Sequence, residues 1–374
     1  MTRFDALFLL LSVFVGVVGC GPADDAPDLG GWTFGDDSLT ATETLLVSGT
    51  DDFYFGAVTD LDVTTDGRLL VADREATNVK VLRPDGTLLD TLGGAGGGPG
   101  EFEALSSVQA ARGDSIYAFD PIRSRLHVFG PASPFEVSRT VTIPREDRSA
   151  NALLVLREHL VGAFSGGLGT PEDGIREPPP LLYRLVREGG APSDTLFRVR
   201  RTRMAMKRIG SRFRGHPLPF ARTSKIALGP DRRLYHGWTD SLRVTAYALD
   251  GGAETVADVP TPPVPVQDSE RDSVLDEMST EMRPVVASGL PDTKSAFTDL
   301  LVSGEGRLWV RRPPAGPEAD RTAWWVLNPG TQTIRALSLP SAVDLEVVWG
   351  RQAYGTTTTD RGAPAVVRYR IDKG

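Results

Sequence analysis

A pattern that occurs twice, end to end, between Asp66 and Phe129 constrains the fold more than any other feature of the sequence. Each copy contains a turn, an apolar strand that ends in Asp, a short polar loop, an alternating strand and another turn. Asp66 and Arg112 hold equivalent positions 46 residues apart, and a period of about 40–50 residues is typical of a propeller blade. The pattern therefore predicts one and a half blades of a β-propeller in this stretch.

The rest of the chain is consistent with the same fold. It contains 40 Gly and 28 Pro but only five Met, a composition that favours many short strands and turns over helical bundles. Following the pattern from Phe55 gives six blades, of which the last has only three strands. We expect residues 42–47 to supply its fourth strand, since an open sheet edge invites pairing with other chains. The predicted fold is all-β, a six-bladed β-propeller over residues 41–374.

One helical insertion interrupts this pattern at about residues 268–283. A Pro-rich passage, residues 260–265, precedes it, and Ser269 and Asp272 have the spacing of a capping box. Apolar residues then recur on one face, and Pro284 is expected to end the helix. We expect this helix to pack on the rim or on one face of the propeller.

Residues 96–129 resemble an NHL repeat, the unit of six-bladed NHL propellers. The sequence there reads G-G-G-P-G-E-F-E-A-L-S-S-V-Q-A-A-R-G-D-S-I-Y-A-F-D-P-I-R-S-R-L-H-V-F. NHL repeats usually have Pro where Leu105 stands and Asn where Ser124 stands. The resemblance covers roughly residues 55–130 and implies the fold rather than an activity.

The N-terminus has the features of an export signal. Arg3 precedes an apolar run of thirteen residues, 6–18, which is too short to span a bilayer and matches the apolar region of a signal peptide. The run ends in V-V-G-C, which resembles the lipobox of bacterial lipoproteins. Residues 1–19 are then a lipoprotein signal peptide and Cys20 carries a diacylglyceryl anchor. The alternative is a short buried helix with a chance Cys.

We expect residues 20–40 to form a flexible acidic tether. Gly21 follows Cys20 where an Asp would retain the protein in the inner membrane, if sorting follows the enteric rule. This predicts a lipid anchor in the cell envelope, in the outer membrane rather than the inner. Removal of residues 1–19 leaves the net charge at −8, which is unfavourable for binding nucleic acid or an anionic membrane surface.

We do not expect the Gly-rich residues 93–100 to form a phosphate-binding loop, because they fit neither G-x-G-x-x-G nor G-x-x-x-x-G-K-[ST] and a strand rather than a helix follows them. We interpret them as a turn between blades. Asp73 and Asp120 end equivalent strands, and this repetition favours a structural role in which each accepts N–H groups of the following turn.

No motif in the sequence indicates catalysis. There is no G-x-S-x-G, and Asn is too sparse to suggest the carboxylate and Asn cluster of lactonase-type propellers, which could form only by convergence in space. The four histidines lie on different blades or insertions, without metal-ligand spacing: His127, His159, His216 and His236. The sequence predicts no catalytic residue, no metal ligand and no cofactor.

Residues 198–216 form the most distinctive segment, with eight Lys or Arg and no acid in an acidic protein. One interpretation is a solvated insertion between blades three and four. The other is an anion-binding patch beside the channel mouth, for a carboxylated or phosphorylated envelope glycan, a lipid headgroup or an acidic protein. The candidate binding residues are Arg200, Arg201, Arg203, Lys207, Arg208, Arg212 and Arg214.

These observations predict a monomeric, lipid-anchored envelope propeller that serves as a binding or scaffolding module for a protein, a glycan or another anionic ligand. The alternative is a propeller enzyme of the lactonase, lyase or strictosidine-synthase-like kind, with a metal in its central channel. A third possibility is a sensor or assembly partner of an outer-membrane complex. Fold alone does not decide between these, because function depends on individual sites.

Overall fold

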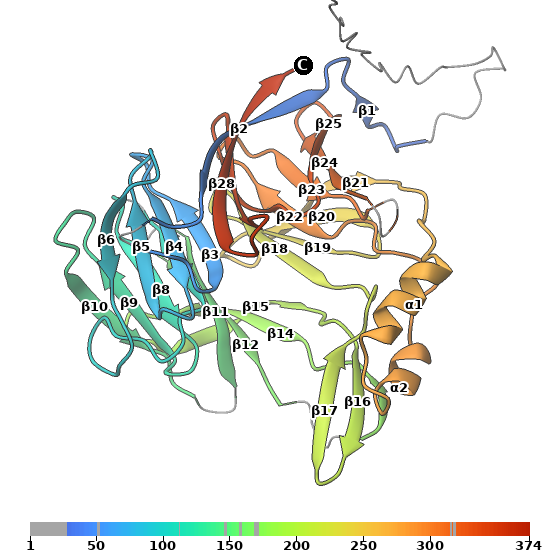
Figure 1. Cartoon of the computed structure of the whole chain (residues 1–374), viewed down its shortest axis with the longest axis horizontal. Helices are drawn as coiled ribbons and strands as arrows, with labels where there is room; N and C mark the ends of the chain where they lie inside the picture. Colours follow the sequence, from blue (N-terminus) through green and yellow to red (C-terminus); the bar gives the residue numbers. More distant parts are fainter. Residues whose placement is uncertain are drawn as a thin grey trace, which may run out of the picture.

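The computed structural model describes residues 28–374 except 51–52, 112, 146–147, 157–158, 168–171, 315 and 317–318. It shows the predicted all-β propeller, in which antiparallel sheets surround a common centre (Figure 1). Arg112 and the predicted anchor residue Cys20 lie outside the described residues.

Six sheets surround the centre, of which five have four strands and sheet five gains a short fifth strand at its outer edge. Four strands of each are ordered from the centre outward as in the chain, except that the outermost strand of sheet six comes from the N-terminal part of the sequence. Sheet one is β3 (Val58–Val63), β4 (Leu69–Asp73), β5 (Asn78–Leu82) and β6 (Leu88–Leu92); sheet two is β7 (Ser107–Ala110), β8 (Ile116–Asp120), β9 (Arg125–Phe129) and β10 (Val137–Thr142). Sheet three is β11 (Ser149–Leu156), β12 (His159–Ser165), β14 (Leu181–Val186) and β15 (Pro192–Val199); sheet four is β18 (Ser224–Leu228), β19 (Leu234–Trp238), β20 (Leu242–Tyr247) and β21 (Ala253–Val259). Sheet five is β22 (Asp299–Val302), β23 (Leu308–Arg311), β24 (Arg321–Asn328) and β25 (Thr333–Pro340); sheet six is β26 (Asp344–Trp349), β27 (Gln352–Thr358), β28 (Pro364–Lys373) and β2 (Leu39–Val47).

The core lies between neighbouring sheets. Successive side chains of a strand point to opposite faces, so one strand contributes to two cores. In β23, Trp309 packs between sheets five and six, whereas Val310 packs between sheets four and five. Buried clusters of this kind join each sheet to the next, including sheet six to sheet one. The first strands β3, β7, β22 and β26 contact one another around the centre.

The predicted closure by the N-terminal strand is confirmed. β2 pairs antiparallel with β28, from Leu39 opposite Lys373 to Val47 opposite Val366. Val47 is buried in the cluster that joins sheets six and one. The strand therefore protects the edge of β28 and also links the last sheet to the first.

The prediction of a flexible tether over residues 20–40 was wrong for the part of that range that the structure describes. Leu29 and Trp32 are buried in the core between sheets four and five. β1 (Thr33–Phe34) then adds to sheet five, parallel to β25. Apolar side chains within the acidic segment provide enough buried surface to hold this part of residues 20–40 against the propeller.

A small lobe projects from the propeller and combines three insertions: one within sheet three, one between sheets three and four, and one between sheets four and five. Its sheet consists of β13 (Gly174–Arg176), β16 (Met204–Ile209) and β17 (Arg212–Pro217), and two helices, α1 (Asp268–Asp276) and α2 (Arg283–Ala287), lie beside it (Figure 1). Their contact has its own apolar core, which includes Ala205, Leu218, Met282 and Val286.

The prediction of a single helix over residues 268–283 was wrong in its extent. α1 starts after Gln267, which forms the capping box with Glu270 in place of the predicted Ser269 and Asp272. Pro284 lies in the first turn of α2 and does not end a helix. A proline is tolerated there, because the first N–H groups of a helix have no partner within it.

Asp73 and Asp120 have the predicted structural role. Asp73 accepts hydrogen bonds from the N–H groups of Gly56, Ala57 and Ala76 at 2.9–3.1 Å. Asp120 accepts one from Glu103 and one from Arg123. Each carboxylate therefore ties its own turn to the chain that enters the same sheet.

The Gly-rich residues 93–100 also form the predicted turn, and an internal carboxylate occupies their donors. Gly97 and Gly98 donate N–H hydrogen bonds to Glu101 Oε2 at 2.8 and 2.7 Å. These bonds lower the pKa of Glu101. Donors that would contact a phosphate are thus already paired.

Candidate functional site

Three of the predicted basic residues line one cavity of about 440 Å³. Arg200, Arg201 and Arg203 come from the segment that joins β15 to β16. Arg222 precedes β18, and Trp238 ends β19. We call this cavity the arginine pocket. It lies where sheets three and four meet the lobe, because Pro291 after α2 and Glu177 after β13 complete its wall.

Arg200 and Trp238 contact each other on this wall. The Arg200 guanidinium carbon lies 4.5 Å from the centre of the Trp238 ring, a geometry that stabilises the cation over the aromatic face. Arg200 also contacts Glu177, with 3.3 Å between Nη2 and Oε1. Both side chains of this ion pair are more than half exposed, so the pair contributes little to stability.

Arg201 and Arg203 have no such partner. Neither side chain forms a hydrogen bond or an ion pair with any residue that the structure describes. The backbone around them is fixed, since Leu218 N–H donates to Arg203 O at 2.9 Å. Two guanidinium groups therefore line the pocket from a fixed backbone, with their donors free for an anion.

Arg222 is anchored from behind and supports the positive potential of the pocket. Its Nη1 and Nη2 donate to the carbonyl and hydroxyl oxygens of Thr293, both at 2.7 Å. Burial lowers the pKa of Arg222 from its ordinary value; the charge of Arg203 adds to this shift, and Asp240 opposes it. Arg222 remains charged at neutral pH. Its sequence position outside the basic run gave no signal of this role.

The other four predicted residues lie elsewhere, on the β16–β17 hairpin. Lys207 Nζ pairs with Asp173 at 2.6 Å, and the backbone N–H of Arg208 donates to the same carboxylate at 2.7 Å. The Arg208 guanidinium covers the ring of Phe213 at 4.5 Å. Arg212 and Arg214 are exposed on β17. The basic segment thus divides into a pocket-lining part and a hairpin part, a division that only the fold defines.

A second group of charged residues faces the centre of the propeller from the first strands of several sheets. Asp60 and Asp62 lie on β3, Asp299 on β22 and Glu346 on β26. Lys225 of β18 contacts Asp299 at 3.4 Å. The sequence analysis did not find this group, which we call the channel carboxylates. Their signal was an acid at alternate positions of inner strands, as in V-T-D-L-D-V and D-L-E-V.

Three of these carboxylates, those of Asp60, Asp62 and Glu346, have raised pKa values. Burial raises the pKa of Glu346 to about 8, and repulsion from Asp60 contributes. Burial likewise raises the pKa of Asp60 to about 7 and that of Asp62 to about 6. Asp60 accepts the N–H of Val108 and Asp62 accepts that of Ala110, each at 2.8 Å, and these bonds oppose the shifts. The two aspartates therefore also join sheet one to sheet two.

The histidines take part in packing. His127 Nδ1 faces Gly100 N–H at 3.2 Å and Thr140 Oγ1 at 3.0 Å, and His236 Nε2 lies 2.9 Å from Ser224 Oγ. Burial lowers the pKa of His236 to about 4. Among residues 28–374, apart from the omitted positions, no three His, Cys, Asp or Glu side chains are arranged as a metal site.

The search for membrane spans covered only the described residues. None of the helices there has both the length and the apolar character needed to cross a bilayer.

No family model matches this sequence, and no curated protein matches it either. Solved structures are similar in fold. An exported protein of Bacteroides fragilis is 10% identical with a TM-score of 0.54, and the match covers 91% of this chain and 98% of that one. A DUF4221 family member of Bacteroides vulgatus has the same identity and TM-score, with 90% and 99% covered.

A virginiamycin B lyase of Staphylococcus aureus is 10% identical with a TM-score of 0.44, over 89% of this chain and 99% of that one. Similarities at these identities concern the fold alone. The function therefore has to be argued from the sites.

Proposed function

We propose that this protein is a lipid-anchored propeller of the cell envelope that binds an anionic glycan in the arginine pocket. One observation carries the proposal: Arg201 and Arg203, two guanidinium groups without partners in the described structure, line a cavity beside the Arg200–Trp238 stack. The protein acts as a monomeric binding module.

The chemistry of the pocket favours a carboxylated or phosphorylated ligand. Each guanidinium offers a planar fork of donors that matches the two oxygens of a carboxylate or phosphate. Arg200, Arg201, Arg203 and Arg222 outnumber the acids Glu177 and Asp240 on the same wall, so the pocket retains positive charge. The indole of Trp238 provides an apolar surface of the kind on which a sugar ring can pack.

The proposed anchor is a diacylglyceryl group on Cys20, in the outer membrane rather than the inner. It would hold the propeller at the surface of the membrane. Replacing Cys20 with Ser should release the protein from membrane fractions. Continued recovery of Cys20→Ser in the membrane pellet would contradict the anchor and leave the pocket proposal intact.

Photocrosslinking in native envelopes tests the binding function. A photoreactive residue in place of Pro291, on the pocket wall, should crosslink to an anionic glycan. The same residue at Ala253, exposed at the start of β21 in sheet four, is the control. A glycan adduct at Pro291 that disappears in Arg201→Gln/Arg203→Gln is expected. A protein or lipid adduct, or equal labelling at Ala253, would contradict the proposal.

The channel carboxylates support a second candidate function, acid–base catalysis in the channel. Groups with pKa values near neutrality can hold and release a proton at working pH, and the values of about 7 and 8 for Asp60 and Glu346 meet this condition. If a channel metal takes part, the purified full chain should retain stoichiometric metal after dialysis, and Glu346→Gln should reduce that metal content.

A further inference from the structure

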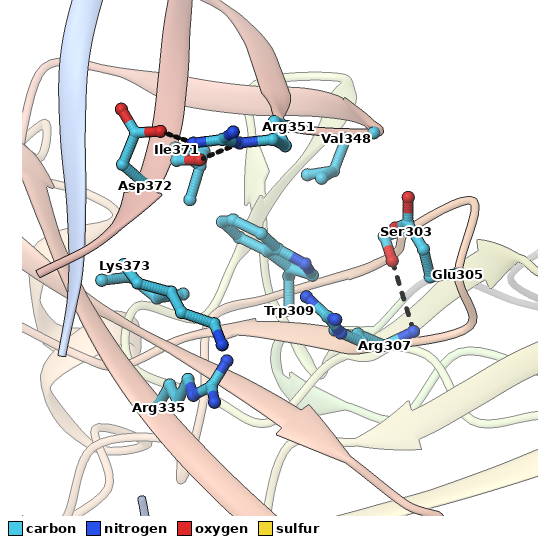
Figure 2. A pocket seen from close by; sticks show the side chains of 12 residues that line it. Ser303, Glu305, Arg307, Trp309, Arg335, Val348, Arg351, Ile371, Asp372 and Lys373 are labelled. Carbon is cyan, nitrogen blue, oxygen red and sulfur yellow. Dashed lines mark hydrogen bonds and ion pairs between the residues drawn. The ribbon is translucent and has the colours of Figure 1, made fainter. Parts of the chain in front are cut away.

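A second cavity, of about 590 Å³, lies between sheets five and six on a part of the propeller that the arginine pocket does not reach. Its wall includes Arg307 from the turn before β23, Arg335 of β25 and Lys373 of β28 (Figure 2). We call it the intersheet cavity. A volume of this size is sufficient for a small organic ligand.

Three cationic side chains of this cavity have no partner. The side chains of Arg307, Arg335 and Lys373 form no hydrogen bond or ion pair with any residue that the structure describes. Arg351 differs, because it pairs with Asp372 on the opposite wall. Unpaired cations that converge on a cavity constitute a ready site for an anion.

Arg335 and Lys373 provide the clearest geometry. Figure 2 shows their charged ends pointing toward one another across the lower wall of the cavity, with no acidic side chain drawn between them. Two like charges at close range repel. An anion between them would attract both cations, which offsets their mutual repulsion. It would also accept hydrogen bonds from both side chains.

Trp309 gives an independent indication. Its side chain lines the same cavity, lies between Arg351 and Arg307 in Figure 2, and is only 4% exposed. Its Nε1 is buried and has no hydrogen-bond partner. A buried N–H without an acceptor is costly, and a ligand oxygen beside Arg307 would provide that acceptor.

The charges define the ligand class. Arg307, Arg335 and Lys373 contribute three positive charges and Glu305 one negative charge, while Arg351 and Asp372 neutralise each other. The remaining two charges match a phosphate monoester, which carries about −1.5 to −2 at neutral pH. The apolar part of the wall, Val348 and Ile371, suits the organic part of such an ester.

We propose that the intersheet cavity binds a small phosphate monoester. Arg335 and Lys373 hold the phosphoryl oxygens, Arg307 and the Trp309 N–H supply further donors, and the ester group lies against the apolar wall. This site is separate from the arginine pocket and does not depend on the function proposed for that pocket.

Isothermal titration calorimetry of the full chain with phenyl phosphate, inorganic phosphate and succinate tests the proposal. Phenyl phosphate should bind most tightly. Arg335→Gln/Lys373→Gln should weaken it by about tenfold or more. Arg361→Gln, which removes one charge at an exposed position outside the cavity and so matches Lys373→Gln alone, should leave it unchanged. Arg201→Gln/Arg203→Gln should also leave it unchanged, which separates this site from the arginine pocket.

Three results would overturn the proposal: no binding of phenyl phosphate, equal weakening by Arg361→Gln, or equal affinity for succinate. The last would assign the cavity to dicarboxylates. If the double variant does not fold by circular dichroism, Lys373→Gln alone serves, because that side chain is exposed. Trp309→Phe keeps the aromatic packing and removes the N–H, so a loss of affinity in this variant tests the indole donor directly.

Discussion

Arg200 lies over the face of Trp238, with 4.5 Å between the guanidinium carbon and the ring centre. These residues come from the segment before β16 and from the end of β19, so only the folded propeller brings them together. The stack fixes one guanidinium of the arginine pocket and leaves Arg201 and Arg203 as the groups free to bind.

The stack can be tested by replacing Trp238. We expect Trp238→Ala to weaken binding of an anionic glycan by about two- to fivefold, because Arg200 loses a cation–π contact of modest strength. Trp238→Phe should retain most of the affinity, since a ring remains beneath the cation. Titration with oligogalacturonate measures the effect. If both variants lose the same affinity for the glycan, the indole does not act through its contact with Arg200.

The channel carboxylates predict a pH dependence of stability. The pKa of Glu346 rises from 4.5 to about 8 in the folded protein, so the folded state binds the proton more tightly than the unfolded state. Its contribution to stability is present at low pH and is lost as the pH rises from about 4 to about 8. Asp60 and Asp62 act in the same direction.

Glu346→Gln should flatten this decline and raise the free energy of unfolding at pH 8 by roughly 1–3 kcal/mol, a range reduced because the side chain is partly exposed. Urea unfolding between pH 4 and pH 8 measures it. If the free energy of unfolding of Glu346→Gln changes with pH in parallel with that of the native sequence, the Glu346 carboxylate does not take up a proton in this range.

Asp73 predicts the opposite dependence. The Lys80 ammonium, 2.8 Å away, and three backbone N–H groups hold its pKa at about 2 despite burial. The stabilisation is complete above the ordinary pKa of a carboxylate and is lost as the pH falls from about 4 toward 2. Acid unfolding of the native sequence should show this loss.

Asp73→Asn should lower the free energy of unfolding at pH 7 by about 3–5 kcal/mol, since Lys80 would remain charged and buried without its partner. Asp73→Asn/Lys80→Met should recover much of the loss. Urea denaturation measures the free energy of unfolding of both variants. If the double variant is as unstable as Asp73→Asn, the loss comes from the hydrogen bonds to the backbone N–H groups instead.

Closure by β2 can be tested at two neighbouring residues. Val47 is 8% exposed and Leu46 is 49% exposed. Val47→Asp places a carboxylate between sheets six and one and should lower the free energy of unfolding by about 2–4 kcal/mol. Leu46→Ser should change it by less than about 0.5 kcal/mol. Similar effects of both substitutions would contradict the buried role of Val47 in closure.

Local signals were sufficient to predict most strands. β3 has the predicted bounds, Val58–Val63, because alternating side chains and a Thr-Asp-Gly turn define it within a few residues. Closure by residues 42–47 followed from a strand missing in the last sheet. The β16–β17 hairpin was not predicted, since its arginines conceal the alternation of apolar side chains.

The sites were less predictable than the strands. Charge composition identified Arg200, Arg201 and Arg203, but Arg222 and Trp238 join them only through the pairing of strands in sheet four. The channel carboxylates and the intersheet cavity likewise combine residues from different sheets. A single sequence does not show which residues of different sheets lie next to one another in the folded propeller.

The most direct test of the central claim is one calorimetric series on the full chain with oligogalacturonate as the anionic glycan. The native sequence should bind. Arg201→Gln/Arg203→Gln should lose affinity by about tenfold or more with no change in melting temperature. Arg212→Gln/Arg214→Gln, an equal loss of charge on the hairpin, should bind as the native sequence does. Equal loss in both double variants, or no loss in either, would contradict the assignment of binding to the arginine pocket.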